Sequence, residues 1–178
     1  VNVVFASGVI RTPLRFMHPV VDMSGNPNVN KIVLSVWKGE VDKYLNLRSF
    51  LKNHNVIVLE LEEPTEVMVG YIKHQMVSLE STISSFNDEE YVLKTRCDLY
   101  MDPSFFNNLI ESIGDWGKIP DDQYAVFSSK IWVMYFELTK PFYLSDEAFL
   151  GKVKDVKKLI NYKDYDNYDI GRGVTHIR

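Results

Sequence analysis

The chain has 178 residues, a length typical of one domain, and a formal net charge of −4. No cluster of lysine and arginine stands out that would neutralise several phosphates, which argues against a general nucleic-acid binder. No apolar run approaches the roughly 18 residues that a membrane-spanning helix needs. The single Cys97 excludes an intramolecular disulfide, and the first residues lack the basic start of a signal peptide. We therefore expect a cytoplasmic protein without a membrane span or a nucleic-acid partner; peripheral contact with a membrane stays open.

Apolar runs bounded by polar or turn-forming residues predict buried strands over residues 3–10, 31–37, 56–61 and 91–101. Between the first two strands, Pro13, Pro19 and Pro27 predict a loop that holds at most one helical turn. Apolar residues at helical spacing predict helices over 39–53 and 65–86, and a third helix begins at Asp102-Pro103.

The second half of the chain is harder to assign. Residues 124–136 are rich in strand-forming residues, and 142–144 predict a shorter strand. Helical spacing returns over 152–162, and residues 163–178 form a polar tail. We expect one domain over residues 1–162.

Strands that alternate with helices predict an α/β fold with a mostly parallel central sheet flanked by helices on both faces. Such sheets bind ligands outside the carboxyl ends of their strands, where the strand order reverses. By this rule, the candidate ligand-binding residues are Ser7-Gly8 and residues 35–40, 60–63 and 96–102.

The segment 94–98 (KTRCD) places three charged residues at the end of an apolar strand. A charge in a central strand is costly unless it is paired or bound to a ligand. Arg96 and Asp98 are two residues apart, so on a strand they share a face and could form an internal ion pair. The alternative is a site in which Asp98 binds Mg²⁺ or Mn²⁺ and a cation lies near a diphosphate. Spacing alone does not decide between the two.

Other candidate residues have simpler interpretations. Asp102 before a proline is typical of a helix cap, with a metal role as the alternative. Cys97 is interpreted as buried filler, and His18, His54 and His74 as structural or surface residues.

A second polar segment lies at residues 144–147 (LSDE). Ser145 or Asp146 could cap a helix. Alternatively, Asp146 or Glu147 accepts the proton of an acceptor hydroxyl, which requires hydrogen-bond reach.

The order of these motifs resembles the WavE lipopolysaccharide-synthesis family of glycosyltransferase-like proteins. The matching pieces cover most of residues 3–160: FASGVIRTP, KIVLSVWKGE, YIKHQMVSLESTISSFNDEEYVLKTRCDLYM and PFYLSDEAFLGKVKDVKKLI. Family members are longer, so we expect a C-terminal portion beyond this chain.

The resemblance implies a GT-A-like domain that uses a nucleotide-diphospho-sugar donor, often with a divalent metal (Mn²⁺ or Mg²⁺). It implies metal and sugar contacts for Asp98 and an acceptor-side role for Asp146. The residues that it implies around the nucleotide are Ala6, Ser7, Gly8, Arg11, Ser35, Trp37, Glu40, Lys73 and Gln75. The chain matches only one acid of the usual Asp-X-Asp pair.

The leading hypothesis is transfer of a sugar from this donor to a glycan or a lipid-linked, lipopolysaccharide-type acceptor. Asp98 positions the donor, Arg96 or Lys94 offsets the diphosphate charge, and Asp146 or Glu147 assists the acceptor. A binding module that has lost catalysis and a nucleotidyltransferase are the alternatives.

Overall fold

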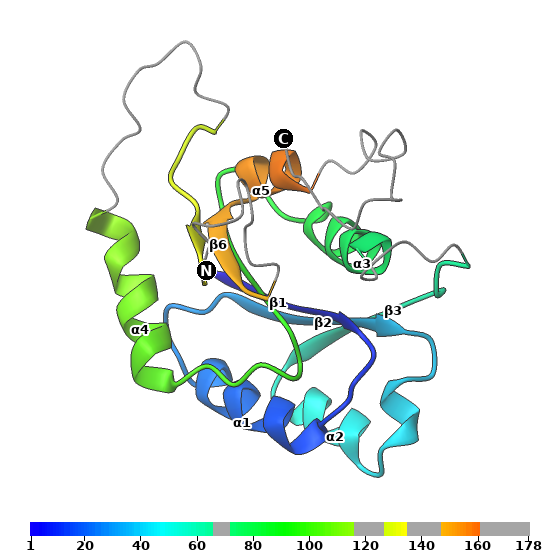
Figure 1. Ribbon diagram of the computed structural model, residues 1–178. Coiled ribbons are helices and arrows are strands. Elements are labelled where there is room, and N and C mark those ends of the chain that lie inside the picture. Colours follow the sequence, from blue (N-terminus) through cyan, green and yellow to red (C-terminus); the bar gives the residue numbers. More distant parts are fainter. Residues whose placement is uncertain (66–71, 116–126, 135–146, 161–178) are drawn as a thin grey trace, which may run out of the picture.

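The computed structural model describes residues 1–65, 72–115, 127–134 and 147–160 (Figure 1). For Lys73 it gives the place in a helix but not the side chain. The predicted strand at 142–144 and the predicted tail at 163–178 lie outside the described residues. No helix in the described part of the chain is both long and apolar enough to cross a membrane.

Within the described residues, six strands form one sheet in the order β3-β2-β1-β4-β6-β5. Strands β1 to β4 are mutually parallel, and β6 runs antiparallel to both of its neighbours. The predicted α/β fold with a mostly parallel sheet is confirmed. The strands are β1 (Asn2–Gly8), β2 (Lys31–Trp37), β3 (Val56–Leu61), β4 (Tyr91–Thr95), β5 (Trp132–Val133) and β6 (Phe149–Lys152).

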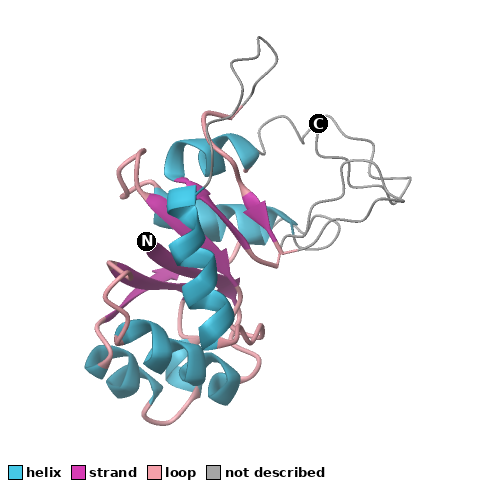
Figure 2. Cartoon of the chain, turned by 90° about the vertical axis from the view of Figure 1, so that its left-hand side faces the viewer, coloured by secondary structure: helices cyan, strands magenta, loops and turns pink. Residues whose placement is uncertain are grey.

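The helices divide between the two faces of the sheet (Figures 1 and 2). One apolar core packs β1 against α1 (Pro13–Ser24), α2 (Leu47–Asn53) and α4 (Pro103–Ser112). The other packs it against α3 (Ile72–Ile83) and α5 (Val153–Leu159). Successive side chains of β1 alternate between the cores, because a strand has a period of two: Phe5 faces the first and Ala6 the second.

The predicted loop at residues 11–30 is wrong, because α1 occupies most of it. Pro13 stands in the first turn, where a backbone N–H has no partner within the helix in any case. Pro19 lies inside the helix and removes one backbone donor. Phe16, Val20 and Met23 are buried against the sheet, and burial of these apolar side chains outweighs that loss.

Three further element boundaries differ from the prediction. The helix predicted over 39–53 is divided into a 3₁₀ turn, η1 (Val41–Lys43), and α2, because Asn46 between them has φ of 64°. The strand predicted over 91–101 ends at Thr95, so Arg96 and Asp98 lie on a turn and not on one face of a strand. In the predicted strand at 124–136, the described part contains only the short β5. Ser145 and Asp146, which could cap a helix, lie outside the described residues, and residues 149–152 form β6.

Asp102 caps α4, as its place before a proline predicts. Its carboxylate accepts hydrogen bonds from the backbone N–H groups of Ser104 at 2.9 Å and Phe105 at 3.3 Å. The hydrogen bond from the Ser104 hydroxyl lowers the pKa of Asp102 most, and the two backbone hydrogen bonds lower it further. The capping role therefore occupies the carboxylate.

A buried carboxylate ties α5 to the segment before β5. Asp155 is 0% exposed and accepts hydrogen bonds from the Ser128 N–H at 2.7 Å, the Ser128 hydroxyl at 2.8 Å and the Ser129 hydroxyl at 2.7 Å. Burial acts to raise the pKa of Asp155, but the hydrogen bonds from Ser128 and Ser129 together hold it below its ordinary value.

We expect Asp155→Ala to lower the free energy of unfolding by about 2–3 kcal/mol at pH 7, because three donors lose a charged acceptor. A pKa that folding lowers contributes stability above the pKa of the unfolded chain, about 3.9, and the contribution disappears as the pH falls through the folded value. The loss caused by the substitution should therefore shrink in acid. Urea denaturation at several pH values measures it. Asp88→Ala, which removes an exposed pair with Lys157 at 2.7 Å, is the matched control and should cost well under 1 kcal/mol.

Gly8 ends β1 with a backbone φ of 64°, a conformation that residues other than glycine rarely adopt. A Cβ atom at Gly8 would lie 2.5 Å from Nε1 of Trp37, at the end of β2. The two strand ends can therefore approach this closely only with glycine at the position.

We expect Gly8→Ala to cost about 2 kcal/mol or more, from backbone strain and from displacement of the Trp37 ring. Gly39→Ala is the matched control, because Gly39 also has a positive φ of 82° but nothing lies within 4 Å of an added Cβ. Denaturation followed by tryptophan fluorescence compares the two. Equal losses for both variants would contradict the close contact between Gly8 and Trp37.

Candidate functional site

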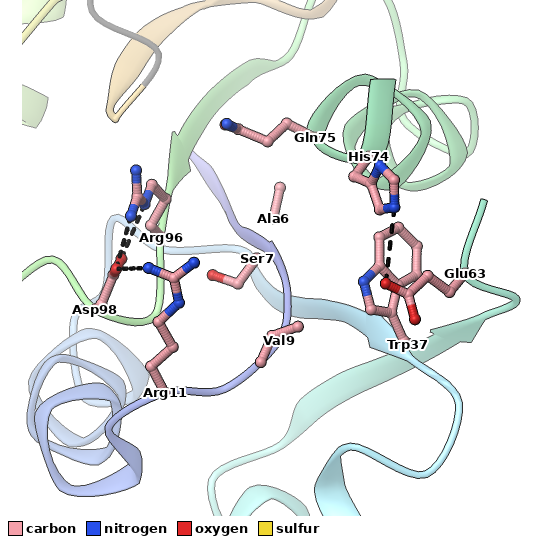
Figure 3. Close-up of a pocket in the computed structure, with 10 residues that line it drawn as sticks. All are labelled: Ala6, Ser7, Val9, Arg11, Trp37, Glu63, His74, Gln75, Arg96 and Asp98. Atoms are coloured by element: carbon pink, nitrogen blue, oxygen red, sulfur yellow. Dashed lines mark hydrogen bonds and ion pairs between the residues drawn. The ribbon is translucent and has the colours of Figure 1, made fainter. Parts of the chain in front are cut away.

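A cavity of about 440 Å³ opens where the carboxyl ends of β1, β2 and β4 meet the start of α3 (Figure 3). The chain leaves β1 toward β2 on one side, and β4 flanks β1 on the other, so the strand order reverses here. The predicted location of the site therefore coincides with a cavity. It is lined by Ala6, Ser7, Val9, Arg11, Trp37, Glu63, His74, Gln75, Arg96 and Asp98.

The floor of the cavity is the end of β1. Ser7 lines it, and its hydroxyl oxygen accepts a hydrogen bond of 2.7 Å from the backbone N–H of Cys97, just after β4. This bond fixes the loop after β1 to the turn after β4, and so sets the distance between the residues that each carries. Burial raises the pKa of the Cys97 thiol to about 12, so Cys97 is protonated at neutral pH, in agreement with its interpretation as buried filler.

At one end of the cavity, Arg96 and Asp98 form a two-point ion pair. Nε and Nη2 of Arg96 donate to the two carboxylate oxygens of Asp98 at 2.9 and 2.7 Å. Nη1 of Arg11 lies 4.0 Å from the same carboxylate (Figure 3). The hydrogen bonds from Arg96 hold the pKa of Asp98 below its ordinary value against the opposing effect of partial burial, so the carboxylate is charged at neutral pH. We call these three residues the arginine end.

The internal ion pair that spacing left open is thus present, and it stands in the cavity. The side chains of Arg96 and Asp98 are 29% and 27% exposed, whereas that of Arg11 is 71% exposed. The Arg96–Asp98 pair is partly accessible and Arg11 is exposed, so a negatively charged ligand can reach the guanidinium groups of Arg96 and Arg11.

Trp37, Glu63 and His74 form the other end of the cavity, which we call the aromatic end (Figure 3). The rings of Trp37 and His74 meet edge to face, with centroids 5.6 Å apart and an interplanar angle of 77°. Nε2 of His74 lies 3.7 Å from Oε1 of Glu63. Three separate elements, the end of β2, the segment after β3 and the first turns of α3, bring these residues together.

Lys94 and Ser35 were predicted to contact the donor, but they are buried beneath the residues that line the cavity. Lys94 is 1% exposed and donates a hydrogen bond of 3.2 Å to Oε1 of Gln75, which lines the cavity. Its Nζ also lies 5.7 Å from the centre of the Phe149 ring. Ser35 is fully buried and accepts a hydrogen bond of 2.8 Å from the Ser78 hydroxyl of α3.

The remaining predicted site residues are placed as follows. Gly8 contributes the close approach to Trp37 but is not among the lining residues. Glu40 is buried and accepts a hydrogen bond of 3.3 Å from the Ile10 N–H, which supports the loop after β1. Glu147 lies just before β6 and does not line the cavity. Asp146 lies outside the described residues, as does the side chain of Lys73.

The described residues do not by themselves form a metal site. Among them, no group of three or more His, Cys, Asp or Glu residues is arranged to hold an ion. Asp98, the predicted ligand, has both oxygens engaged by Arg96, and two cationic side chains surround it. Binding of Mn²⁺ or Mg²⁺ at Asp98 stays a prediction.

Sequence patterns do not identify Val9 and His74 as site residues, and they mark Glu63 only as part of a strand end. The spacing between His74 and the other histidines is not typical of metal ligands. Its neighbour Gln75 is implied as a site residue only by the resemblance to the WavE family. The useful signal was topological: Glu63 follows β3, and His74 lies in the first turns of the next helix. Both therefore belong at the carboxyl edge of the sheet.

Comparison with solved structures finds this fold in proteins of very different sequence. TarS of S. aureus, residues 1–349, matches with a TM-score of 0.51 at 15% identity, over 94% of this chain and 49% of that chain. A 4-diphosphocytidyl-2C-methyl-D-erythritol synthase matches with a TM-score of 0.52 at 11% identity, over 98% of this chain and 85% of that chain. This chain thus spans about half the length of the TarS chain.

No protein-family model and no curated protein matches the sequence, so the resemblance to the WavE family is not confirmed and stays a prediction. The structural matches show the fold alone: the chain shares a GT-A-like α/β architecture with these two proteins.

Proposed function

We propose that the chain is a cytoplasmic glycosyltransferase that takes a sugar from a nucleotide-diphospho-sugar and passes it to a glycan or a lipopolysaccharide-type acceptor. The observation that carries the proposal is the pair of arginines at one end of the cavity, at the switch point of the sheet. The cavity volume of about 440 Å³ lies in the usual range for small-molecule sites.

The arginine end suits a diphosphate. A guanidinium group donates two parallel hydrogen bonds to a phosphate as readily as to a carboxylate. Arg96 already makes this two-point contact with Asp98, so a diphosphate can replace the carboxylate without a change in the geometry of the guanidinium group. Arg11, on the loop after β1, is the more exposed of the two arginines and is free to turn toward the ligand.

In the proposed reaction the acceptor hydroxyl attacks the anomeric carbon of the donor sugar. The bond from that carbon to the diphosphate oxygen breaks, and its electron pair stays on the departing nucleoside diphosphate. Arg96 and Arg11 stabilise the charge that builds up on the leaving group, which is a large contribution in a preorganised site. The proton of the acceptor hydroxyl passes to a carboxylate, for which Asp146 and Glu147 remain the predicted candidates.

Asp98 has two proposed roles that an experiment can separate. As the internal partner of Arg96, it competes with the diphosphate for the guanidinium group. As a ligand of Mn²⁺ or Mg²⁺, it would turn away from Arg96 and hold the ion against the diphosphate, where the ion would supply further positive charge.

A nucleotidyltransferase is the second candidate, because the fold likeness covers 85% of the 4-diphosphocytidyl-2C-methyl-D-erythritol synthase chain. The two reactions differ in their products. Glycosyl transfer consumes a nucleotide sugar and releases a nucleoside diphosphate, whereas nucleotidyl transfer consumes a nucleoside triphosphate and releases pyrophosphate. Binding of the nucleotide without turnover of either kind would indicate a module that has lost catalysis.

The proposal is tested by calorimetric titration of the chain with UDP-, GDP-, CDP- and TDP-sugars, each with and without Mn²⁺. We expect at least one donor to bind, and Arg96→Ala to weaken that binding roughly tenfold to a hundredfold, because a charge-assisted hydrogen bond contributes about 1.5–3 kcal/mol. Arg48→Ala is the matched control: Arg48 pairs with Asp42 at 2.8 Å, away from the cavity, and its loss should leave binding unchanged. If no donor binds, the proposal fails.

We expect Asp98→Asn to bind the same donor about threefold or more tightly in EDTA, because the competing negative charge is gone while the side-chain shape is kept. In Mn²⁺ the same variant should lose whatever gain the ion gives the unmodified chain. Calorimetry in the two buffers measures both effects. Weaker binding in EDTA would show that Asp98 is not a competitor of the diphosphate.

A further inference from the structure

The aromatic end of the cavity differs chemically from the arginine end. Trp37 is 5% exposed and is held on one side by Gly8 and on another by the edge of the His74 ring. It is therefore a fixed part of the cavity wall that leaves only a small aromatic surface for contact with a base, and such contact favours no base over another.

Glu63 gives this end a polar group with a definite preference. Its side chain is 59% exposed, and its contact with Nε2 of His74, at 3.7 Å, is too long for a hydrogen bond. Within the described part of the chain, no residue donates a hydrogen bond to the Glu63 carboxylate. A carboxylate only accepts hydrogen bonds, through two oxygens side by side, so it favours a ligand that presents two adjacent N–H donors.

We propose that the aromatic end binds the base of the donor nucleotide and that Glu63 selects guanine. This inference rests on the proposed function, because the diphosphate at the arginine end directs the base to the opposite end of the same cavity. The ring N1–H and the exocyclic amino group of guanine are adjacent donors that match the two oxygens of Glu63.

The other bases match the carboxylate less well. Uracil offers one N–H between two carbonyl oxygens, and both oxygens would face the negative charge of Glu63. Cytosine and adenine each offer one amino group beside a ring nitrogen that is an acceptor. The carboxylate therefore disfavours uracil most strongly, and it ranks cytosine and adenine between uracil and guanine.

Calorimetric titration of the full chain with GDP, CDP, ADP, UDP and inorganic pyrophosphate, in EDTA and at one salt concentration, tests the inference. We expect GDP to bind about tenfold or more tightly than UDP, because a good two-point contact with a base gives roughly five- to hundred-fold discrimination. Glu63→Gln should weaken GDP binding by a similar factor, leave pyrophosphate binding unchanged and improve UDP binding, since the amide can donate to a carbonyl.

Glu62→Gln is the matched control. Glu62 is the neighbouring residue, its side chain is 83% exposed, and it pairs with Lys38 at 3.0 Å instead of lining the cavity. It should leave the preference among the bases unchanged. Thermal denaturation of both variants confirms that each is folded, as exposed positions lead us to expect.

The outcomes separate the inference from the function on which it rests. Equal binding of all four nucleoside diphosphates, or a preference that Glu63→Gln does not change, overturns the role of Glu63 and leaves the proposed donor site standing. Tightest binding of CDP, ADP or UDP overturns the choice of guanine in the same way. If neither pyrophosphate nor any nucleotide binds, the proposed function fails and the inference fails with it.

Discussion

The parallel pairing of β1 with strands on both sides is the constraint on which the rest of the structure depends. β1 pairs with β2 over one edge and with β4 over the other, so its side chains fill both apolar cores and its backbone has no exposed edge. Gly8 makes the turn that ends β1, and the cavity lies at the carboxyl ends of β1, β2 and β4, where the strand order reverses. The site is therefore a consequence of the topology, and its side chains decide only what it binds.

The same constraint explains why charged residues can stand so close to the core. Arg96 follows the last paired residue of β4, where the backbone leaves the sheet and water reaches the side chain. Lys94, two residues earlier, is still within the strand and is almost fully buried, so it needs Gln75 and the Phe149 ring as partners. Lys94 in the strand thus supports the cavity wall, whereas Arg96, two residues further along the chain and beyond the strand, can contact a ligand.

Continuous apolar runs predicted the first three strands well. β1 and β2 are buried on both faces of the sheet, whereas β3 is an edge strand that is apolar in sequence but only partly buried. The strand predicted over 91–101 is too long, because Leu99 and Met101 continue the apolar pattern beyond the turn that follows β4. Periodicity alone does not distinguish such a turn from a strand. The loop predicted at α1 is wrong, because that prediction used a local sequence feature, Pro19. The helix depends on tertiary contacts such as the burial of Phe16, which a local feature does not reveal. The partnership of Trp37, Glu63 and His74 could not be predicted from spacing, since three elements distant in sequence create it. The strand-end rule located the region without identifying these contacts.

The order of the strands gives the proposed donor a direction. A nucleotide sugar is linear, with base, ribose, diphosphate and sugar in that sequence. With the base at Trp37, the last residue of β2, and the diphosphate at Arg96, just after β4, the sugar would extend past β4, away from β2. The next strand on that side is β6, and Glu147 lies two residues before its first residue, Phe149. A carboxylate that accepts the proton of the acceptor hydroxyl belongs beside the sugar, so the segment preceding β6 is where this orientation of the donor requires it.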